Sequence, residues 1–260
     1  MSLFEVEHLT RVYTTGRRRV VALDDVSLTV EPGQRLGIVG ESGSGKSTLV
    51  RLMAGLDRPT SGSVRFDGRP VSGVPERDLG FLRAAVQFVF QDPRSSLNPR
   101  MRVGDIVAEP LRSPLVRKEV GAVDQAARVA EVLDAVGLPA DAVRRFPHEF
   151  SGGQRQRIAI ALALAPSPQV LIADEAVSAL DVSVRAQVLN LLMSLVDDLG
   201  LTLLFVSHDL AVVRHVCPHA VVLQAGKIVE GGPTQRLFSA PEHPYTARLV
   251  AAIPTFRARS

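Results

Sequence analysis

Short apolar segments separated by turn-forming residues follow one another from the N-terminus to Phe90. Segments of this length and composition are typical of β-strands. The predicted strands are Phe4–Leu9, Val20–Leu23, Val26–Val30, Arg35–Gly40, Val64–Phe66 and Ala85–Phe90. Glu31-Pro-Gly33 predicts a turn between strands, and Asp67-Gly68 predicts a hairpin. We therefore expect an N-terminal antiparallel β subdomain.

The pattern changes between Pro93 and about Ala165, where strand signals disappear and a helical period takes over. Within Val123–Val136 one face of a helix would carry Ala126, Val129, Ala130, Leu133 and Val136. The connection Pro93–Arg102 contains two prolines and Asn98, which predicts a loop on which a partner could dock. Residues 93–165 are therefore expected to form an inserted helical subdomain.

Strands and helices alternate in the last third of the chain, which favours a largely parallel sheet covered by helices. The predicted strands are Val170–Ala173, Thr202–Val206, Ala220–Gln224 and Lys227–Glu230, and the predicted helices lie near Val184–Leu199 and Leu210–Val216. We predict an α/β fold whose core is built from residues 1–92 and 166–260.

Composition excludes several classes of function. The 260 residues carry 30 Lys+Arg against 27 Asp+Glu, a net charge of +3 that gives no indication of nucleic-acid binding. The single cysteine, Cys217, excludes an internal disulfide and is expected to be a buried thiol. The longest apolar stretch, Ile158–Pro166, is far shorter than the ~20 residues that span a bilayer, and the N-terminus does not resemble a signal peptide. We expect a cytoplasmic chain whose membrane role, if it has one, depends on partners.

One string carries the chemistry of phosphate binding. Gly40–Thr48 reads GESGSGKST and fits the spacing G-x-x-x-x-G-K-[ST], between an apolar strand and a helix with Leu49, Leu52 and Met53 on one face. The expected nucleotide-binding residues are Gly40, Glu41, Ser42, Gly43, Ser44, Gly45, Lys46, Ser47 and Thr48. Backbone amides would cradle the phosphates, while Lys46 reaches the β- and γ-phosphates and Ser47 holds Mg²⁺.

Two carboxylates follow another apolar strand, Val170–Ala173. Ligands of open parallel sheets bind beyond the carboxyl ends of the strands, where the phosphate loop also opens. Asp174 is placed to hold Mg²⁺ through water, and Glu175 to polarise a water for attack on the γ-phosphate. The pattern is common by itself, but together with the phosphate loop it predicts a nucleotide-hydrolysing site.

Ser151, Gly152, Gly153 and Gln154 form a second anion-binding candidate. Ser151 and Gln154 have the spacing of a capping box at the start of a helix that continues through Ile158, and two glycines leave that helix end bare. A nucleotide has one γ-phosphate. Either two nucleotides bind per chain, or this helix end contacts the nucleotide of another chain.

Taken together, these strings resemble the nucleotide-binding subunit of an ABC transporter over essentially the whole chain. The matching segments are Gly40–Thr48 for the Walker A loop, Gln91 for the Q-loop, Ser151–Gln154 for the signature, Val170–Glu175 for the Walker B strand, Asp181 for the D-loop and His208 for the switch histidine. The resemblance implies a P-loop NTPase with a RecA-like core, which uses ATP and Mg²⁺. It implies catalytic roles for Glu175, His208 and Gln91, a metal site at Ser47, Gln91 and Asp174, and adenine stacking on Tyr13.

Narrower strings resemble the ATPases of dipeptide, oligopeptide and nickel importers. They are Phe90–Met101, Pro147–Arg155, Leu180–Val184 and His243–Thr246. Ala176 and Leu162 depart from the pattern of peptide members and leave peptide and nickel open, and an exporter motor is the more distant alternative. The expected partners are a second ATP-binding subunit, identical or not, transmembrane permease subunits and, indirectly, a solute-binding protein. This places the chain at the cytoplasmic face of the membrane.

Overall fold

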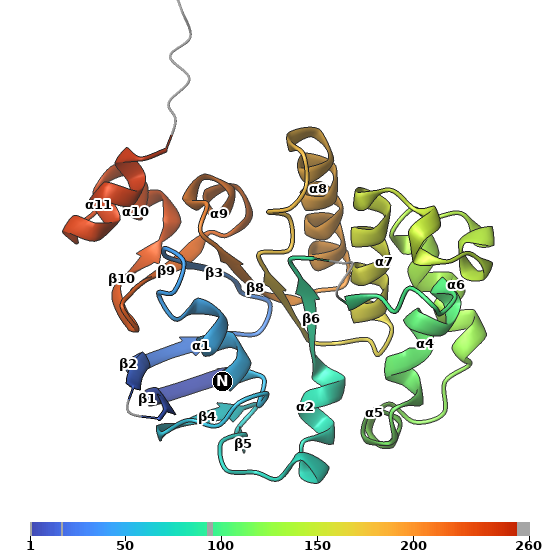
Figure 1. Cartoon of the computed structure of the whole chain (residues 1–260), viewed down its shortest axis with the longest axis horizontal. Helices are drawn as coiled ribbons and strands as arrows, with labels where there is room; N and C mark the ends of the chain where they lie inside the picture. The colour runs from blue at the N-terminus through green and yellow to red at the C-terminus, as the bar shows by residue number, and fades with distance from the viewer. Residues whose placement is uncertain (1, 17, 93–95, 254–260) are drawn as a thin grey trace, which may run out of the picture.

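The computed structural model describes residues 2–16, 18–92 and 96–253. A four-stranded antiparallel sheet forms the N-terminal part, in the order β2-β1-β4-β5. Its strands are β1 (Phe4–Thr15), β2 (Arg18–Val30), β4 (Ser61–Phe66) and β5 (Arg69–Pro70). Figure 1 shows these strands in blue and cyan beside α1 (Lys46–Met53).

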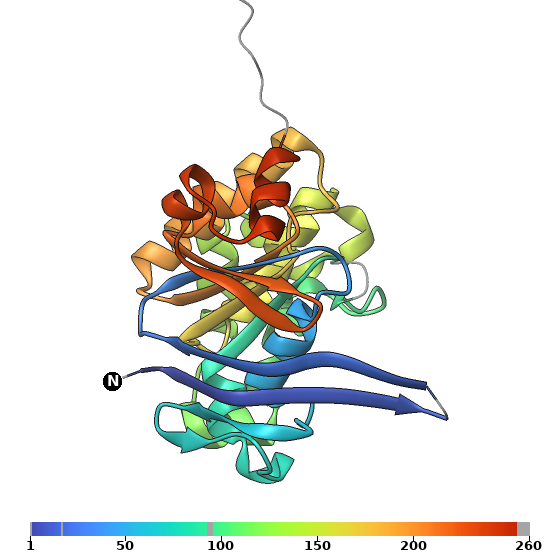
Figure 2. The ribbon, with the colours of Figure 1, turned by 90° about the vertical axis from the view of Figure 1, so that its left-hand side faces the viewer.

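A six-stranded sheet in the order β10-β9-β3-β8-β7-β6 forms the centre of the molecule. Its strands are β3 (Arg35–Val39), β6 (Val86–Phe90), β7 (Val170–Asp174), β8 (Thr202–Ser207), β9 (His219–Gln224) and β10 (Lys227–Pro233). All neighbouring pairs are parallel except β9 and β10, which form an antiparallel hairpin at one edge. Figure 2 shows this hairpin in orange above the blue β1–β2 hairpin.

Alternate residues of the central strands enter two different cores. Leu171, Leu203 and Phe205 pack with the helices on one face, and Ile172 and Leu204 pack on the other with α1 and the antiparallel sheet. A strand that is buried on both faces needs a continuous apolar run, which explains why β7 and β8 read as uninterrupted apolar segments.

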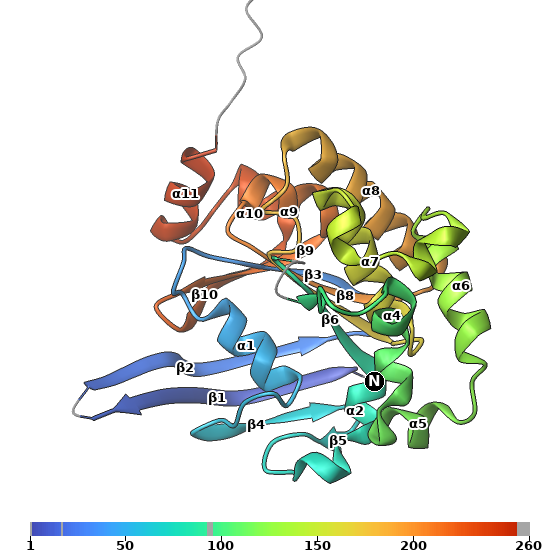
Figure 3. The ribbon, with the colours of Figure 1, turned by 45° about the vertical axis from the view of Figure 1, so that its right-hand side comes forward.

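The helices beyond α1 fall into three groups, seen together in Figure 3. The short α2 (Gly80–Ala85) leads into β6. The segment between β6 and β7 contains α4 (Val103–Arg112), α5 (Pro114–Val120), α6 (Gln125–Ala135) and α7 (Gly152–Leu164), with short 3₁₀ turns at Ala140–Arg144 and Pro147–Glu149. The last part carries α8 (Val182–Asp198), α9 (Leu210–Val216), α10 (Thr234–Ser239) and α11 (Pro244–Ala251).

The predicted α/β class is confirmed, but several local predictions were wrong. Val20–Leu23 and Val26–Val30 belong to the single strand β2, because the polar step between them is a bulge: Asp25 has φ +56° and its amide donates to Thr10. On α6, Ala126 and Ala130 are exposed, and Val132 is buried instead.

The division into 1–92, 93–165 and 166–260 stays a prediction, and Pro93, Arg94 and Ser95 of the predicted docking loop lie outside the described residues. Within the described ranges, every helix is too short or too polar to cross a bilayer.

We expect Gly37→Ala to destabilise the fold because of one close contact. A Cβ on Gly37 of β3 would lie 2.3 Å from Val213 Cγ1, on the helix α9 that covers this strand. Overpacking of this kind costs about 1–3 kcal/mol. Val213→Ala alone should also destabilise the protein, whereas the double variant should lose ~1 kcal/mol less than the sum. Urea unfolding of the four proteins measures the coupling, and strictly additive losses would contradict this packing.

Candidate functional site

The phosphate loop connects the carboxyl end of β3 to the first turn of α1. Gly45 precedes α1 with φ +109°, and a Cβ there would lie 2.5 Å from the carbonyl oxygen of Ala22 in β2, so only glycine fits. On the other side, the carbonyl of Ser44 accepts a hydrogen bond from Gly226 N (2.9 Å), in the turn between β9 and β10. The loop predicted from the sequence is therefore held between two β-hairpins.

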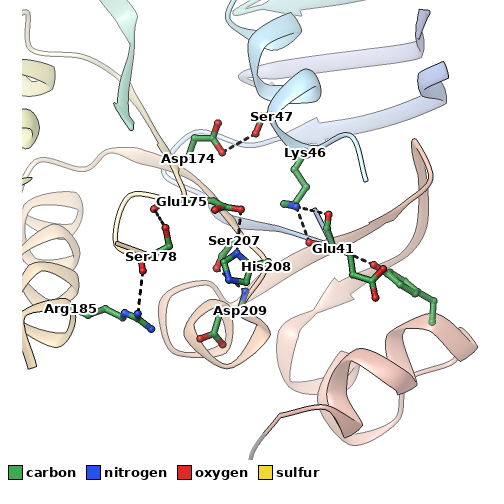
Figure 4. Close-up of polar contacts among 12 residues, drawn as sticks. Glu41, Lys46, Ser47, Asp174, Glu175, Ser178, Arg185, Ser207, His208 and Asp209 are labelled. Carbon is green, nitrogen blue, oxygen red and sulfur yellow. Dashed lines mark hydrogen bonds and ion pairs between the residues drawn. The ribbon is translucent and has the colours of Figure 1, made fainter. Parts of the chain in front are cut away.

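Lys46 begins α1 and bends back over the loop. Its Nζ donates to the carbonyl oxygens of Gly40 (2.8 Å) and Glu41 (2.9 Å), and only 5% of the residue is exposed. Burial lowers the pKa of this ammonium, and the carboxylates of Glu175 and Asp174 oppose that shift. Figure 4 shows Lys46 between the loop and these two acids. The structure thus holds a partly desolvated positive charge where phosphate oxygens would bind.

Ser47 and Asp174 face each other across the site. Ser47 Oγ donates to Asp174 Oδ1 at 3.2 Å, which joins the first turn of α1 to the end of β7 (Figure 4). Burial raises the pKa of Asp174, the Ser47 hydrogen bond opposes this, and the charge of Glu175 adds to it. A hydroxyl and a carboxylate in contact are oxygen donors of the kind that Mg²⁺ prefers.

Glu175 and His208 form the next pair along the edge of the sheet. His208 Nδ1 lies 3.2 Å from Glu175 Oε1, and the amide of Glu175 donates to the carbonyl of Val206 in β8. Glu175 has φ +50°, an unusual conformation for a residue with a side chain, and the Ser178 amide and hydroxyl both donate to its carbonyl. The backbone thus turns sharply at Glu175 and is held there.

Gln91 and Tyr13 are two further residues that the sequence assigns to this site. Gln91 follows Phe90, which pairs with Asp174, so Gln91 and Glu175 both follow neighbouring parallel strands at the same end of the sheet. Tyr13 lies on β1 and is 37% exposed. Its hydroxyl donates to Asp57 at 2.6 Å, and the Arg11 guanidinium lies 4.4 Å from its ring centroid. Stacking on a base would therefore use the ring face that Arg11 leaves open.

The segment Ser151–Gln154 caps α7 as its sequence predicts. Gln154 N donates to Ser151 Oγ (3.3 Å), and Ser151 N donates to Gln154 Oε1 (3.0 Å). A Cβ on Gly153 would lie 2.5 Å from Val184 Cγ1, which places this helix end against α8. Asp181 caps α8 by accepting from Val184 N. Among the described residues, no hydrogen bond joins Ser151–Gln154 to the phosphate loop, so these two anion-binding candidates are separate within one chain.

Two contacts at the site are absent from the sequence prediction. The Glu41 amide donates to the hydroxyl of Tyr245 on α11 at 2.9 Å, and Arg185 on α8 donates to the carbonyl of Leu180 at 3.1 Å. Tyr245 lies in His243–Thr246, which the sequence marks only as a string of the importer ATPases. Nothing in the sequence indicates Arg185.

The residues present fit a nucleoside triphosphate with Mg²⁺. Around the position of a Cβ on Gly43 no heavy atom lies within 4 Å, which leaves the loop open on that side. Lys46 supplies the positive charge, Ser47 and Asp174 supply oxygen ligands, and Glu175 and His208 stand next to them. This arrangement combines phosphate binding with a carboxylate that can accept a proton from water.

Asp174→Asn is expected to stabilise the nucleotide-free protein and to weaken Mg²⁺-dependent binding. Because the folded pKa of Asp174 lies above its unfolded value, stability falls as pH rises through the interval between them and stays lowered at pH 7. An amide removes this cost but is a poorer Mg²⁺ ligand. The Tm without nucleotide should rise by about 2 °C or more, and the shift on adding ATP and Mg²⁺ should fall by at least about half.

Asp198→Asn provides the control, since Asp198 is exposed on the last turn of α8. Thermal denaturation of both variants, with and without nucleotide, makes the measurement. An unchanged Tm together with a full Mg²⁺-dependent shift in Asp174→Asn would contradict the assigned position of the metal.

Known proteins resemble this chain in sequence over almost its full length. A protein of Brucella abortus (strain 2308) with the provisional name of peptide import ATP-binding protein is 53% identical over 247 residues, 93% of this chain and 72% of that protein. The glutathione import ATP-binding protein GsiA of Escherichia coli (strain K12) is 50% identical over 237 residues, 91% of this chain. This chain spans only 38% of GsiA.

Solved structures with the same fold include the dimeric post-hydrolysis state of the ATP-binding cassette MJ0796 bound to ADP and Pi. It has a TM-score of 0.78 and 31% identity, and covers 89% of this chain and 98% of its own. The cbiO1 protein of Clostridium perfringens, part of the ABC transporter complex cbiONQ, has a TM-score of 0.78 and 28% identity. The match covers 93% of this chain and 92% of the cbiO1 chain. The family model described as ABC transporter matches residues 23–178, so this chain belongs to the ABC transporter family, as one of its ATP-hydrolysing cassettes.

Proposed function

We propose that this protein is the ATP-hydrolysing motor subunit of an ABC importer that takes up peptides across the cytoplasmic membrane. The observation that carries the proposal is the alignment of Lys46, the Ser47–Asp174 pair and the Glu175–His208 pair at one edge of the sheet. The names of the relatives at 53% and 50% identity, peptide import and glutathione import, support peptides as the cargo. No feature of the structure favours nickel over them.

The described side chains have separable tasks in hydrolysis. Lys46 and the loop amides bind the phosphates, and Tyr13 offers a ring face to the base. Ser47, Asp174 and Gln91 would hold Mg²⁺, which neutralises phosphate charge when bound. Glu175 accepts a proton from the attacking water. As this happens, the water oxygen bonds to the γ-phosphorus, and the bond between the γ-phosphorus and the ADP oxygen breaks. His208 lies 3.2 Å from the carboxylate, where it can orient Glu175 and would contact the γ-phosphate.

A head-to-tail pair of cassettes accounts for the two separate anion-binding ends. In such a pair, Ser151, Gly152, Gly153 and Gln154 of one subunit would contact the γ-phosphate that is held by the loop of the other. Asp181 lies beside that helix end, at the start of α8. The MJ0796 cassette, which shares the fold, is described as dimeric. ATP would close the pair and hydrolysis would reopen it; the partner subunit is identical or a different chain.

Contact with the permease is assigned to the segment around Gln91. The division into a core of residues 1–92 and 166–260 and a helical part of residues 93–165 puts the connection Asp92–Met101 between the site and α4. Gln91 immediately precedes this connection and follows β6, the strand that pairs with β7, so we expect changes at the site to reach it. The permease would then hold the chain at the cytoplasmic face of the membrane.

Glu175→Gln and Lys46→Ala should separate binding from hydrolysis. Glu175→Gln removes the proton acceptor but keeps the shape, so hydrolysis should fall at least about 100-fold while ATP binding is retained. ATP should then hold this variant as a dimer, seen by light scattering. Lys46→Ala removes the buried ammonium and should abolish nucleotide binding in calorimetry. Lys118→Ala, an exposed lysine on α5, is the matched control. Wild-type turnover in Glu175→Gln, or ATP affinity retained in Lys46→Ala, would contradict the proposed roles.

The cargo is tested in the assembled transporter, because a motor subunit does not contact its solute. The tagged chain is purified together with its membrane and solute-binding subunits, and the ATPase rate of the reconstituted complex is measured with dipeptides, oligopeptides or Ni²⁺. We expect peptides to raise the rate several-fold. A rate that responds to Ni²⁺ and not to peptides would overturn the peptide assignment while leaving the motor function in place.

A further inference from the structure

Both polar groups of one peptide unit in the phosphate loop, the unit between Gly40 and Glu41, are bound from outside that unit. The amide of Glu41 donates to the Tyr245 hydroxyl at 2.9 Å, and the carbonyl of Gly40 accepts from Lys46 Nζ at 2.8 Å. Tyr245 is 204 positions further along the chain, on α11. Residue Glu41 therefore lies between the phosphate-binding lysine and a C-terminal helix; Figure 4 draws its contact with Lys46.

Tyr245 is itself rigidly placed. Only 3% of it is exposed, and its ring packs in the larger hydrophobic core. Its amide donates to Nδ1 of His243, which caps α11. The amides of Glu242 and His243 donate to the two carboxylate oxygens of Glu230 on β10, at 2.9 and 3.0 Å. Burial alone would raise the pKa of Glu230, but polar contacts that include these two amides together outweigh it and lower the pKa. The hydroxyl is thus fixed to the central sheet through Glu230.

The two halves of the loop are restrained by different partners. The second half is held at Ser44 by Gly226 and at Gly45 by close contact with Ala22. In the first half, the Glu41 carbonyl accepts from the Ser44 amide at 3.2 Å within the loop itself, while the position of a Cβ on Gly43 has open space around it. The Tyr245 hydroxyl adds a restraint from a distant helix, on the amide of Glu41.

We infer that Tyr245 is a positioning residue for the phosphate loop: its hydroxyl holds the Glu41 peptide, and through it Lys46, in the orientation that receives the phosphates of the nucleotide. This inference deepens the proposed ATP site and rests on it. It also gives the C-terminal helix α11 a defined task at the site, although α11 contributes no residue to the nucleotide-binding motifs.

Tyr245→Phe removes the hydroxyl and leaves the ring in the core. The loss of one neutral hydrogen bond corresponds to roughly a 3- to 10-fold change in an equilibrium constant. We expect the Kd for ADP and the KM for ATP to rise by about this factor. The kcat should stay within about twofold, because Glu175 and His208 follow other strands, β7 and β8.

Thr234→Val is the matched control for stability. Thr234 is 2% exposed on the neighbouring helix α10, and its hydroxyl donates to the Cys217 carbonyl at 2.6 Å without touching the loop. This variant should lower the Tm and leave the Kd for ADP unchanged. If Tyr245→Phe behaves in the same way, with lower stability and wild-type nucleotide affinity, its role is structural only and the inference is wrong.

A spectroscopic experiment on the wild-type chain does not depend on that variant. The chain has two tyrosines and no tryptophan, so 3-fluorotyrosine gives two ¹⁹F signals, and the signal missing from Tyr13→Phe identifies the remaining one as that of Tyr245. We expect this signal to shift when ADP binds and to stay in place when ADP is added to Lys46→Ala.

The outcomes distinguish the two proposals. If calorimetry detects no nucleotide binding to the wild-type chain, the proposed ATPase function fails. If ADP binds but the Tyr245 signal does not move, and Tyr245→Phe binds ADP as tightly as wild type, only the positioning role of Tyr245 fails.

Discussion

The register of the parallel strands is the constraint on which the whole site depends. Val39 pairs with Ser207, and Asp174 pairs with both Val206 and Phe90. These pairs bring the residues that follow each strand to one edge of the sheet, where the loop, Glu175, His208 and Gln91 meet. Because a slip by one residue would turn every side chain to the opposite face, the two cores on either side of the sheet fix this register. The position of the chemistry is therefore a consequence of apolar packing.

The site maintains charges that would be more stable in water. Burial lowers the pKa of Lys46 and raises that of Asp174, so for each group the surroundings disfavour the charged form. The carbonyls of Gly40 and Glu41 stabilise the ammonium, and Ser47 stabilises the carboxylate. Such groups are already oriented when a ligand arrives, and in a partly desolvated site they act more strongly than they would in water. These desolvated charges make the free protein less stable, and they also leave its site preorganised for a ligand.

The sequence predicted those parts of the site whose chemistry is encoded in neighbouring residues. Gly40–Thr48, Val170–Glu175 and the capping box at Ser151 adopt the expected strand, loop and helix settings because the spacing of their side chains follows the local backbone period. Tyr245 could not be found in this way, since its partner lies 204 positions away and only the folded chain brings them together. The bulge at Asp25 could likewise not be predicted from the sequence. A polar step between two apolar runs is typical of a turn, and only the pairing with β1 shows that both runs belong to one strand.

A continuous series of contacts connects Glu175 to the capped end of α7. Ser178 donates twice to the Glu175 carbonyl, and Arg185 reaches back from α8 to the carbonyls of Ser178 and Leu180. In the same turn of α8, Val184 touches Gly153 so closely that no side chain would fit there. The first turn of α8 thus joins the backbone of Glu175 to the capped end of α7. In a head-to-tail pair, Glu175 would act on one nucleotide and the α7 end on the other, so this rigid turn would make the positions of the two sites depend on each other.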